Sequence, residues 1–195
     1  MKKYTRIVLA CMLCLLMTLT AVTASAAQTG YYDDCYNMIH ITDAVNGRLT
    51  MKMATRTGPS TRFTEPGTFF KAGETVRCIS QTKDDGGVVW VQVEFTYRGA
   101  LMRAYTGLKR LNVDTSKLVW ENDYRKFESI DCCIPWDTQY GYTGPGYQYA
   151  RCDFKVYAQE QYYVIAEENG WFQLQTQDLQ SGMIRCWVPM GNVMY

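Results

Sequence analysis

The sequence contains a single histidine, His40, among its 195 residues. A Ser–His or Cys–His hydrolase needs that ring within hydrogen-bond reach of its nucleophile. His40 precedes both of the repeated segments described below, and no Gly-x-Ser-x-Gly turn occurs anywhere. No Cys-x-x-Cys pair follows residue 26, so a structural zinc site is poorly supported. We expect a protein that is not an enzyme and binds no metal or cofactor, and we interpret His40 as a surface or loop histidine.

Three adjacent acid pairs are the remaining candidates for catalysis: Asp33-Asp34, Asp84-Asp85 and Glu167-Glu168. Glycoside hydrolysis needs two carboxylates that face each other across a cleft. Two of the three pairs occupy predicted hairpin tips, where acidic side chains are ordinary solvated turn residues. A hydrolase of the cell envelope is therefore the disfavoured alternative.

No apolar run after residue 26 is long enough to span a bilayer. Before it, a basic start is followed by an apolar run from Ile7 to Val22 and by the small residues Ala24-Ser25-Ala26, the pattern of an export signal. A lipid-anchoring site at Cys11 is disfavoured, because almost no apolar segment precedes it. We therefore expect residues 1–26 to be a signal peptide and the mature chain to be secreted or extracellular, with the cell wall as one location.

Acidic and basic residues nearly balance. The full chain has 20 Lys and Arg against 19 Asp and Glu, and loss of the predicted signal would leave 17 basic residues, a net charge of −2. Electrostatic capture of nucleic acid or anionic lipid requires clustered basic residues. We expect no nucleic-acid partner and no membrane span after signal cleavage.

A stretch from Met53 to Phe95 returns in a looser form between Gln139 and Thr176. Thr57-Gly58-Pro59 aligns with Thr143-Gly144-Pro145, and Trp90 aligns with Trp171. A repeat of this length indicates one small β module written twice.

Each copy carries strand and turn signals. Alternation predicts a first strand from Leu49 to Thr55, which the turn Asn46-Gly47 opens and Gly58-Pro59 ends. A long loop and the tight turn Lys71–Glu74 lead to a strand at Thr75–Ser80. Further strands are predicted at Val88–Thr96 and Leu101–Thr106, joined by hairpins at Asp84–Gly87 and Arg98-Gly99. Residues 116–127 are expected either to form a short helix or to cross between the copies.

The predicted mature chain has six cysteines, an even number that in an exported protein suggests disulfides. Cys78 aligns with Val164 and Cys186 with Ala104, so we interpret these two as core packing residues. The better candidates for one or two bridges have no such counterpart; they are Cys35, Cys132, Cys133 and Cys152.

Three segments of the first copy form a recognisable set: Thr57–Thr61 after the first strand, Lys71–Val76 before the second, and Trp90–Phe95 after a polar turn. With these residues, the first copy resembles the bacterial SH3-like domain of exported proteins. The match covers about Leu49–Val113 well and Pro135–Val193 more weakly. It implies an all-β chain of two tandem small antiparallel barrels that bind a cell-wall or other surface polymer, or a protein. The expected organisation is a signal at 1–26, a leader at 27–48, domains at 49–113 and 135–195, and a linker at 114–134.

Aromatic residues are the best candidates for a binding surface. Strand alternation places Val91, Val93 and Phe95 inside, and Trp90 on the opposite face with Gln92 and Glu94; Trp171 repeats the pattern. Each Trp either lies under the long loop of its own copy, the favoured interpretation, or lines a groove between that loop and the preceding hairpin. The tyrosine-rich loop of the second copy offers broad contact area. The candidate ligand-binding residues are Arg56, Arg62, Phe63, Trp90, Tyr140, Tyr142, Tyr147, Tyr149 and Trp171.

From the sequence we therefore expect an exported binding protein that recognises peptidoglycan, another surface polymer or an extracellular peptide or protein. The alternative is a structural or assembly role, in which the modules pack on each other or on a protein partner and the aromatic residues form interface core.

Overall fold

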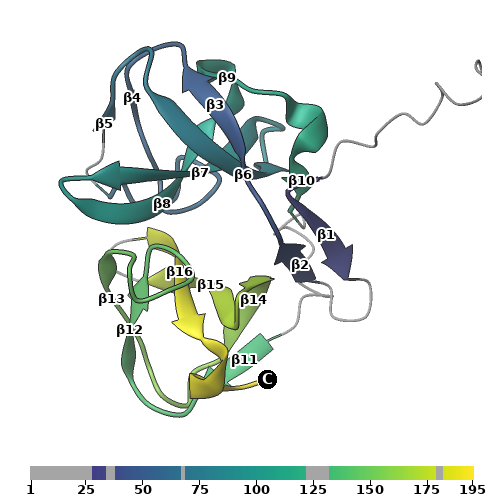
Figure 1. The fold of residues 1–195 in the computed structure, drawn as a ribbon. Helices are drawn as coiled ribbons and strands as arrows, with labels where there is room; N and C mark the ends of the chain where they lie inside the picture. Colours follow the sequence, from purple (N-terminus) through teal and green to yellow (C-terminus); the bar gives the residue numbers. More distant parts are fainter. Residues whose placement is uncertain (1–27, 34–37, 67–68, 122–131, 179–181) are drawn as a thin grey trace, which may run out of the picture.

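The computed structural model of the chain describes residues 28–33, 38–66, 69–121, 132–178 and 182–195. These residues form β-strands and single-turn 3-10 helices, so the predicted all-β class is confirmed. Two main sheets lie in two halves, the N-terminal half (residues 45–121) and the C-terminal half (residues 132–195), which pack against each other (Figure 1). No helix among the described residues is long and apolar enough to cross a membrane.

The N-terminal half contains a six-stranded sheet with the order β8-β7-β6-β3-β9, in which β10 pairs in parallel with β6. Its strands are β3 (Val45–Leu49), β6 (Thr75–Lys83), β7 (Val89–Tyr97), β8 (Ala100–Gly107), β9 (Leu111–Asn112) and β10 (Val119–Trp120). A separate pair, β4 (Met53–Ala54) and β5 (Phe69–Phe70), lies within the long loop, and two 3-10 turns, η1 (Leu108–Arg110) and η2 (Thr115–Lys117), follow β8 and β9.

The C-terminal half provides most of a nine-stranded sheet, to which the leader adds two strands. The leader strands are β1 (Gly30–Asp33) and β2 (Met38–Ile41). The others are β11 (Cys132–Pro135), β12 (Gln139–Tyr142), β13 (Arg151–Val156), β14 (Tyr162–Glu168), β15 (Trp171–Asp178), β16 (Gly182–Pro189) and β17 (Val193–Met194), with the 3-10 turn η4 (Met190–Asn192) before the last.

The two halves share one succession of elements. In each, a first strand is followed by a long loop, three antiparallel strands joined by hairpins, a 3-10 turn and a short last strand that pairs with the first: β9 with β3, and β17 with β11. The sequence predicts two closed barrels, but neither sheet closes into a barrel. Between β8 and the long loop there is one isolated bridge, Arg56 to Tyr105, and between β12 and β16 one pair, Tyr142 to Trp187, so the outer edges are held by single contacts.

Local turn chemistry follows the sequence closely. Asp84 accepts the backbone N–H of Gly87 and donates its own to Val88, which closes the hairpin between β6 and β7. Arg98 and Gly99 both have positive φ, 52° and 85°, as a two-residue hairpin requires. Gly73 at φ 89° completes the tight turn before β6. These predicted turns are confirmed.

The prediction of one strand from Leu49 to Thr55 is wrong. Asn46-Gly47 lies inside β3 and not in a turn, and the chain bends at residues 50 and 51 before β4 begins. Gly47 is present for close packing: a Cβ on it would lie 2.5 Å from the Cys78 Sγ. A glycine inside a strand often marks this kind of approach.

The leader contributes two strands to the C-terminal sheet. Residues 30–33 form β1 and residues 38–41 form β2, and β2 pairs in parallel with β14 through Ile39 and Ala166. His40 is on this strand rather than in a loop; its Nδ1 lies 2.7 Å from Glu167 Oε2 and its ring stacks on Tyr31. The fully buried Thr29 accepts the Val119 N–H at 3.0 Å and bonds the Ile79 carbonyl of the N-terminal half. The leader thus joins both halves.

The residues between the copies also join the sheets. Within the predicted linker 114–134, residues 115–117 form η2, β10 pairs with β6, and β11 belongs to the C-terminal half. The part of the short-helix prediction beyond Glu121 lies outside the described residues.

Each half has its own apolar core, built from alternate strand positions. Cys78 packs with Val91, Val93 and Phe95 in the N-terminal core, and Cys186 packs with Phe172 and Leu174 in the other. Both cysteines are therefore core residues, as their alignment predicts.

The predicted bridges do not form among Cys132, Cys133 and Cys152, because no disulfide joins any two of these three residues. Neighbouring strand residues point to opposite faces, so only Cys133 of the adjacent pair enters the core. Cys35 lies outside the described residues.

Candidate binding site

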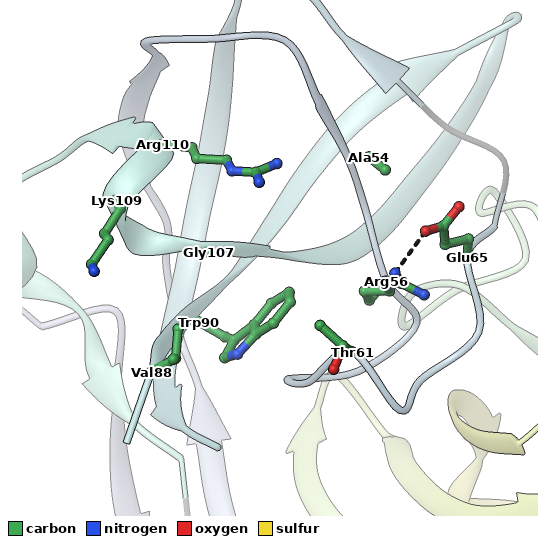
Figure 2. Close-up of a pocket in the computed structure, with 9 residues that line it drawn as sticks. All are labelled: Ala54, Arg56, Thr61, Glu65, Val88, Trp90, Gly107, Lys109 and Arg110. Carbon is green, nitrogen blue, oxygen red and sulfur yellow. Dashed lines mark ion pairs between the residues drawn. The ribbon is translucent and has the colours of Figure 1, made fainter. Parts of the chain in front are cut away.

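A groove of about 430 Å³ opens on the surface of the N-terminal half, with the Trp90 ring at its centre (Figure 2). Three segments form it: the long loop after β4, the hairpin before β7 and the turn η1. Its lining residues are Ala54, Arg56, Thr61, Glu65, Val88, Trp90, Gly107, Lys109 and Arg110. An aromatic surface within a shallow groove suits an extended chain.

The position of Trp90 follows from the alternation along β7. Val91 and Val93 point into the core, so Trp90 lies on the opposite face. Its Nε1 donates to Asp84 Oδ2 at 3.0 Å, while Asp84 Oδ1 accepts the backbone N–H groups of Gly86 and Val88. One turn carboxylate therefore holds both the hairpin and the indole. Asp84 is a structural turn residue and not merely a solvated one.

The long loop is held at both ends of the groove. Arg56 pairs with the Tyr105 backbone in both directions, donates to the Phe63 carbonyl at 3.2 Å, and forms an ion pair with Glu65 at 2.7 Å. Gly58 is needed because a Cβ there would lie 2.2 Å from the Phe63 ring. The loop thus folds over its own aromatic residue and leaves Thr61 beside Trp90.

The rim of the groove is basic. Lys109 and Arg110 project from η1 and are exposed, and Arg56 adds a third cation, against one carboxylate, Glu65. Because Glu65 is already paired with Arg56, the two cations of η1 are the groups best placed to attract a ligand anion.

The equivalent loop of the C-terminal half is filled by aromatic rings. Tyr147 corresponds to Thr61 and lies edge-on to Trp171 at 4.9 Å, and Tyr142 contacts both rings at 5.5 and 5.4 Å. Tyr147 itself is 70% exposed. Here the loop covers its own tryptophan with a ring that still faces solvent.

The predicted site residues do not form one surface. Trp90 and Arg56 line the groove, whereas Tyr142, Tyr147 and Trp171 cluster in the other half. Both tryptophans are only 8% exposed, so each lies mainly under its own loop, and Trp90 also lines the groove.

The remaining predicted residues lie elsewhere. Arg62 is exposed and pairs with Asp85 at 3.0 Å, and Tyr140 lies under the Arg151 guanidinium at 4.1 Å. Phe63 and Tyr149 are buried, at 1% and 7% exposure, between the halves. Sequence reasoning missed Glu65, Lys109 and Arg110. For the last two, the available signal was a basic pair that follows the predicted strand Leu101–Thr106 after Gly107 and Leu108.

The halves meet in nearly symmetric contacts. Phe63 bridges Met183, and Tyr149 bridges Leu101. Arg185 lies over the Phe63 ring at 5.8 Å, and Arg103 lies over the Tyr149 ring at 5.3 Å. The ring that each loop encloses therefore packs under an arginine of the opposite sheet.

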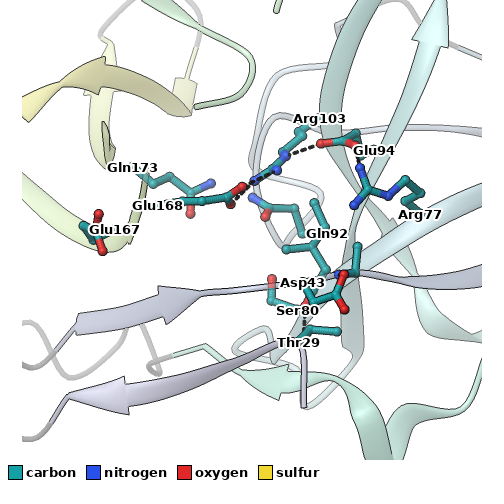
Figure 3. A network of polar contacts seen from close by, with 12 residues as sticks. Thr29, Asp43, Arg77, Ser80, Gln92, Glu94, Arg103, Glu167, Glu168 and Gln173 are labelled. Carbon is teal, nitrogen blue, oxygen red and sulfur yellow. Dashed lines mark hydrogen bonds and ion pairs between the residues drawn. The ribbon is translucent and has the colours of Figure 1, made fainter. Parts of the chain in front are cut away.

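Between the sheets lies a buried polar network (Figure 3). Arg103 donates to Glu94 at 2.9 Å in its own half and to Glu168 at 2.6 and 2.9 Å in the other. Burial alone would raise the pKa of Glu94, but Arg103, Tyr149 and Arg77 hold that pKa below its ordinary value. Burial raises the pKa of the Tyr149 hydroxyl to about 12. Glu168 is thus the ion-pair partner of Arg103 at the interface between the halves rather than a solvated turn residue.

A second buried arginine, Arg185, completes this network. It donates to Glu121 at 2.6 Å, to the Tyr105 hydroxyl at 2.8 Å and to Gln175 at 2.9 Å. Side-chain exposure is 0% for Arg185 and 1% for Glu121. Burial disfavours the charged form of Arg185, but Tyr105 and Glu121 outweigh burial and raise the pKa of the Arg185 guanidinium. The network fixes how the halves sit together.

Three thiols lie in surroundings that suppress their ionisation. Burial raises the pKa of the Cys78, Cys133 and Cys152 thiols to about 12, which keeps them protonated at neutral pH. Among the described residues, no group of three or more His, Cys, Asp and Glu side chains is placed to hold a metal ion.

No protein-family model matches the chain, and no curated protein matches its sequence.

Proposed function

We propose that this chain is an exported, non-enzymatic binding protein that recognises a cell-wall polymer or an extracellular peptide through the groove above Trp90. The observation that carries the proposal is the combination of an indole floor, a loop fixed by the Arg56–Glu65 ion pair, and the exposed cations Lys109 and Arg110. Export rests on the signal-like residues 1–26.

The resemblance to bacterial SH3-like domains supports this proposal. Both halves follow the same succession of strands, and the groove lies between the long loop and the hairpin before the Trp90 strand. Extended peptides bind SH3-type folds on aromatic walls in this region. We therefore place the ligand along the Trp90 ring, with its backbone extended.

The ligand should carry a negative charge near one end. Peptide stems of the cell wall have free carboxylates, which the Arg110 guanidinium can bind in a bidentate manner. An apolar segment of the same stem would pack on Trp90 and Val88. Peptidoglycan is for this reason the first ligand to test.

A pull-down on purified peptidoglycan tests the proposal. Arg110→Glu reverses one rim charge and is expected to lower retention at least tenfold, because a charged hydrogen bond contributes about 1.5–3 kcal/mol. Arg98→Glu is the matched control, since Arg98 is an exposed cation at the opposite end of β7. Equal retention of both variants and the wild type would contradict binding in this groove.

A structural or assembly role is the second candidate. The specific observation in its favour is that Phe63 and Tyr149, both predicted to bind ligand, are packed between the halves. If assembly is the function, the protein should form a stable oligomer on size-exclusion chromatography and show no retention on cell wall. A monomer that is retained excludes this candidate.

A further inference from the structure

Trp136 is the most exposed of the five tryptophans, at 61%. It follows β11 directly, and its backbone N–H donates to the Asn192 carbonyl of η4 at 3.0 Å. The backbone is therefore fixed while the ring faces solvent. A large indole left exposed on a fixed backbone is typical of a contact surface.

Beside the ring lies a pocket of about 190 Å³, lined by Trp136, Asp137, Gln139, Gly191 and Asn192. Gly191 brings backbone to the pocket without a side chain, and the other residues supply a carboxylate and two amides. The pocket is large enough for one small ring and too small for a folded peptide segment.

The two amides that line the pocket have only part of their hydrogen bonds made within the protein. Asn192 Nδ2 donates to Gln139 Oε1 at 2.8 Å, which orients both amides. The Gln139 Nε2 is buried and has no hydrogen-bond partner among the described residues. This amide N–H is an unpaired donor in a residue that lines the pocket, and the Asp137 carboxylate would accept from a ligand hydroxyl.

The equivalent position of the N-terminal half has no aromatic ring. There Thr50 donates its backbone N–H to the Arg110 carbonyl at 2.9 Å, the counterpart of the contact between Trp136 and Asn192. The same backbone geometry thus carries Thr and Arg in one half and Trp and Asn in the other. The fold does not require a ring at this position, so its presence calls for another reason.

We propose that the pocket beside Trp136 binds one sugar unit of a glycan. The apolar C–H face of a pyranose can pack on the Trp136 indole. Its hydroxyls can donate to the Asp137 carboxylate and can both donate to and accept from the Gln139 and Asn192 amides. The inference extends the proposed recognition of a cell-wall polymer to a second site, and it does not depend on the groove above Trp90.

The test is titration of the full mature chain with two soluble probes, the trisaccharide of N-acetylglucosamine and maltotriose, followed by tryptophan fluorescence and NMR. Saturable binding of either probe with a dissociation constant of about 1 mM is expected for a ligand of this size. Trp136→Ala should weaken binding at least tenfold, Trp136→Phe less, and Gln139→Glu several-fold through loss of the amide donor.

Matched controls separate this site from the groove. Trp120→Ala removes another exposed indole, at 49% exposure on β10, and should leave sugar binding unchanged. Arg110→Glu should also leave it unchanged while it lowers retention on peptidoglycan. If both probes fail to bind at about 20 mM, far above the expected constant, the inference is overturned. It is also overturned if Trp136→Ala binds normally, or if it only abolishes self-association, which would make the ring a protein contact.

Discussion

The long loops of the two halves have the same backbone plan and present different surfaces. In both, a glycine lies against the ring that the loop encloses: Gly58 against Phe63, and Gly144 against Tyr149. Both enclosed rings pack under an arginine of the opposite sheet. The outer position differs: Thr61 lines the groove above Trp90, whereas Tyr147 packs edge-on against Trp171, although both indoles are 8% exposed. The enclosed rings of the two loops thus stabilise the contact between the halves, whereas the outer loop positions, Thr61 and Tyr147, are available for recognition.

The largest expected effect is a loss of stability that differs between the two buried arginines, Arg185 and Arg103. Arg185→Met leaves the buried Glu121 carboxylate without its cation and should lower the free energy of unfolding by about 3–5 kcal/mol. Arg103→Met should cost less, because Glu94 keeps Arg77 and Glu168 is partly exposed. Urea denaturation of both variants measures the difference. Equal losses would show that the two contacts are equivalent after all.

A smaller effect should be the same in both loops. Gly58→Ala and Gly144→Ala each place a Cβ 2.2 Å from a buried ring, so each should destabilise the protein by about 1–3 kcal/mol through overpacking. Thermal unfolding of the two variants checks this. A loss in one loop alone would break the structural equivalence of the halves.

The smallest effect concerns acid stability at Glu94. Since the pKa of Glu94 is lowered in the folded protein, its contribution is present above the ordinary value of 4.5 and is lost as pH falls through the lowered pKa. Glu94→Gln should be less stable at neutral pH and should show a shallower loss of stability below pH 4.5 than the wild type. Denaturation midpoints at several pH values supply the test, and parallel curves would contradict it.

Much of the local structure could be predicted from the sequence. The hairpins at Asp84–Gly87 and Arg98-Gly99, and the placement of Cys78 and Cys186 in cores, depend on turn chemistry and strand alternation, which act over short distances. Alternation also places Trp90, Gln92 and Glu94 on one face. It cannot say what covers that face, and here the other half covers Gln92 and Glu94.

The candidate site was predictable only in part. Trp90 and Arg56 lie in the repeated pattern, but the basic rim comes from η1, a turn whose direction depends on how β8 ends and β9 pairs with β3. Gly47 was misinterpreted for a similar reason, since the atom it makes room for, Cys78 Sγ, is distant in sequence. The buried pair of Arg185 and Glu121 likewise joins segments that no local pattern connects.

The exchange of the outer residues tests the central claim most directly. Retention on purified peptidoglycan would be measured for Thr61→Tyr, which gives the open groove the ring of the other half, and for Tyr147→Thr, which removes that ring. If the groove above Trp90 is the binding site, Thr61→Tyr should lose retention to the level of Arg110→Glu, and Tyr147→Thr should keep it. Full retention by Thr61→Tyr would contradict the account.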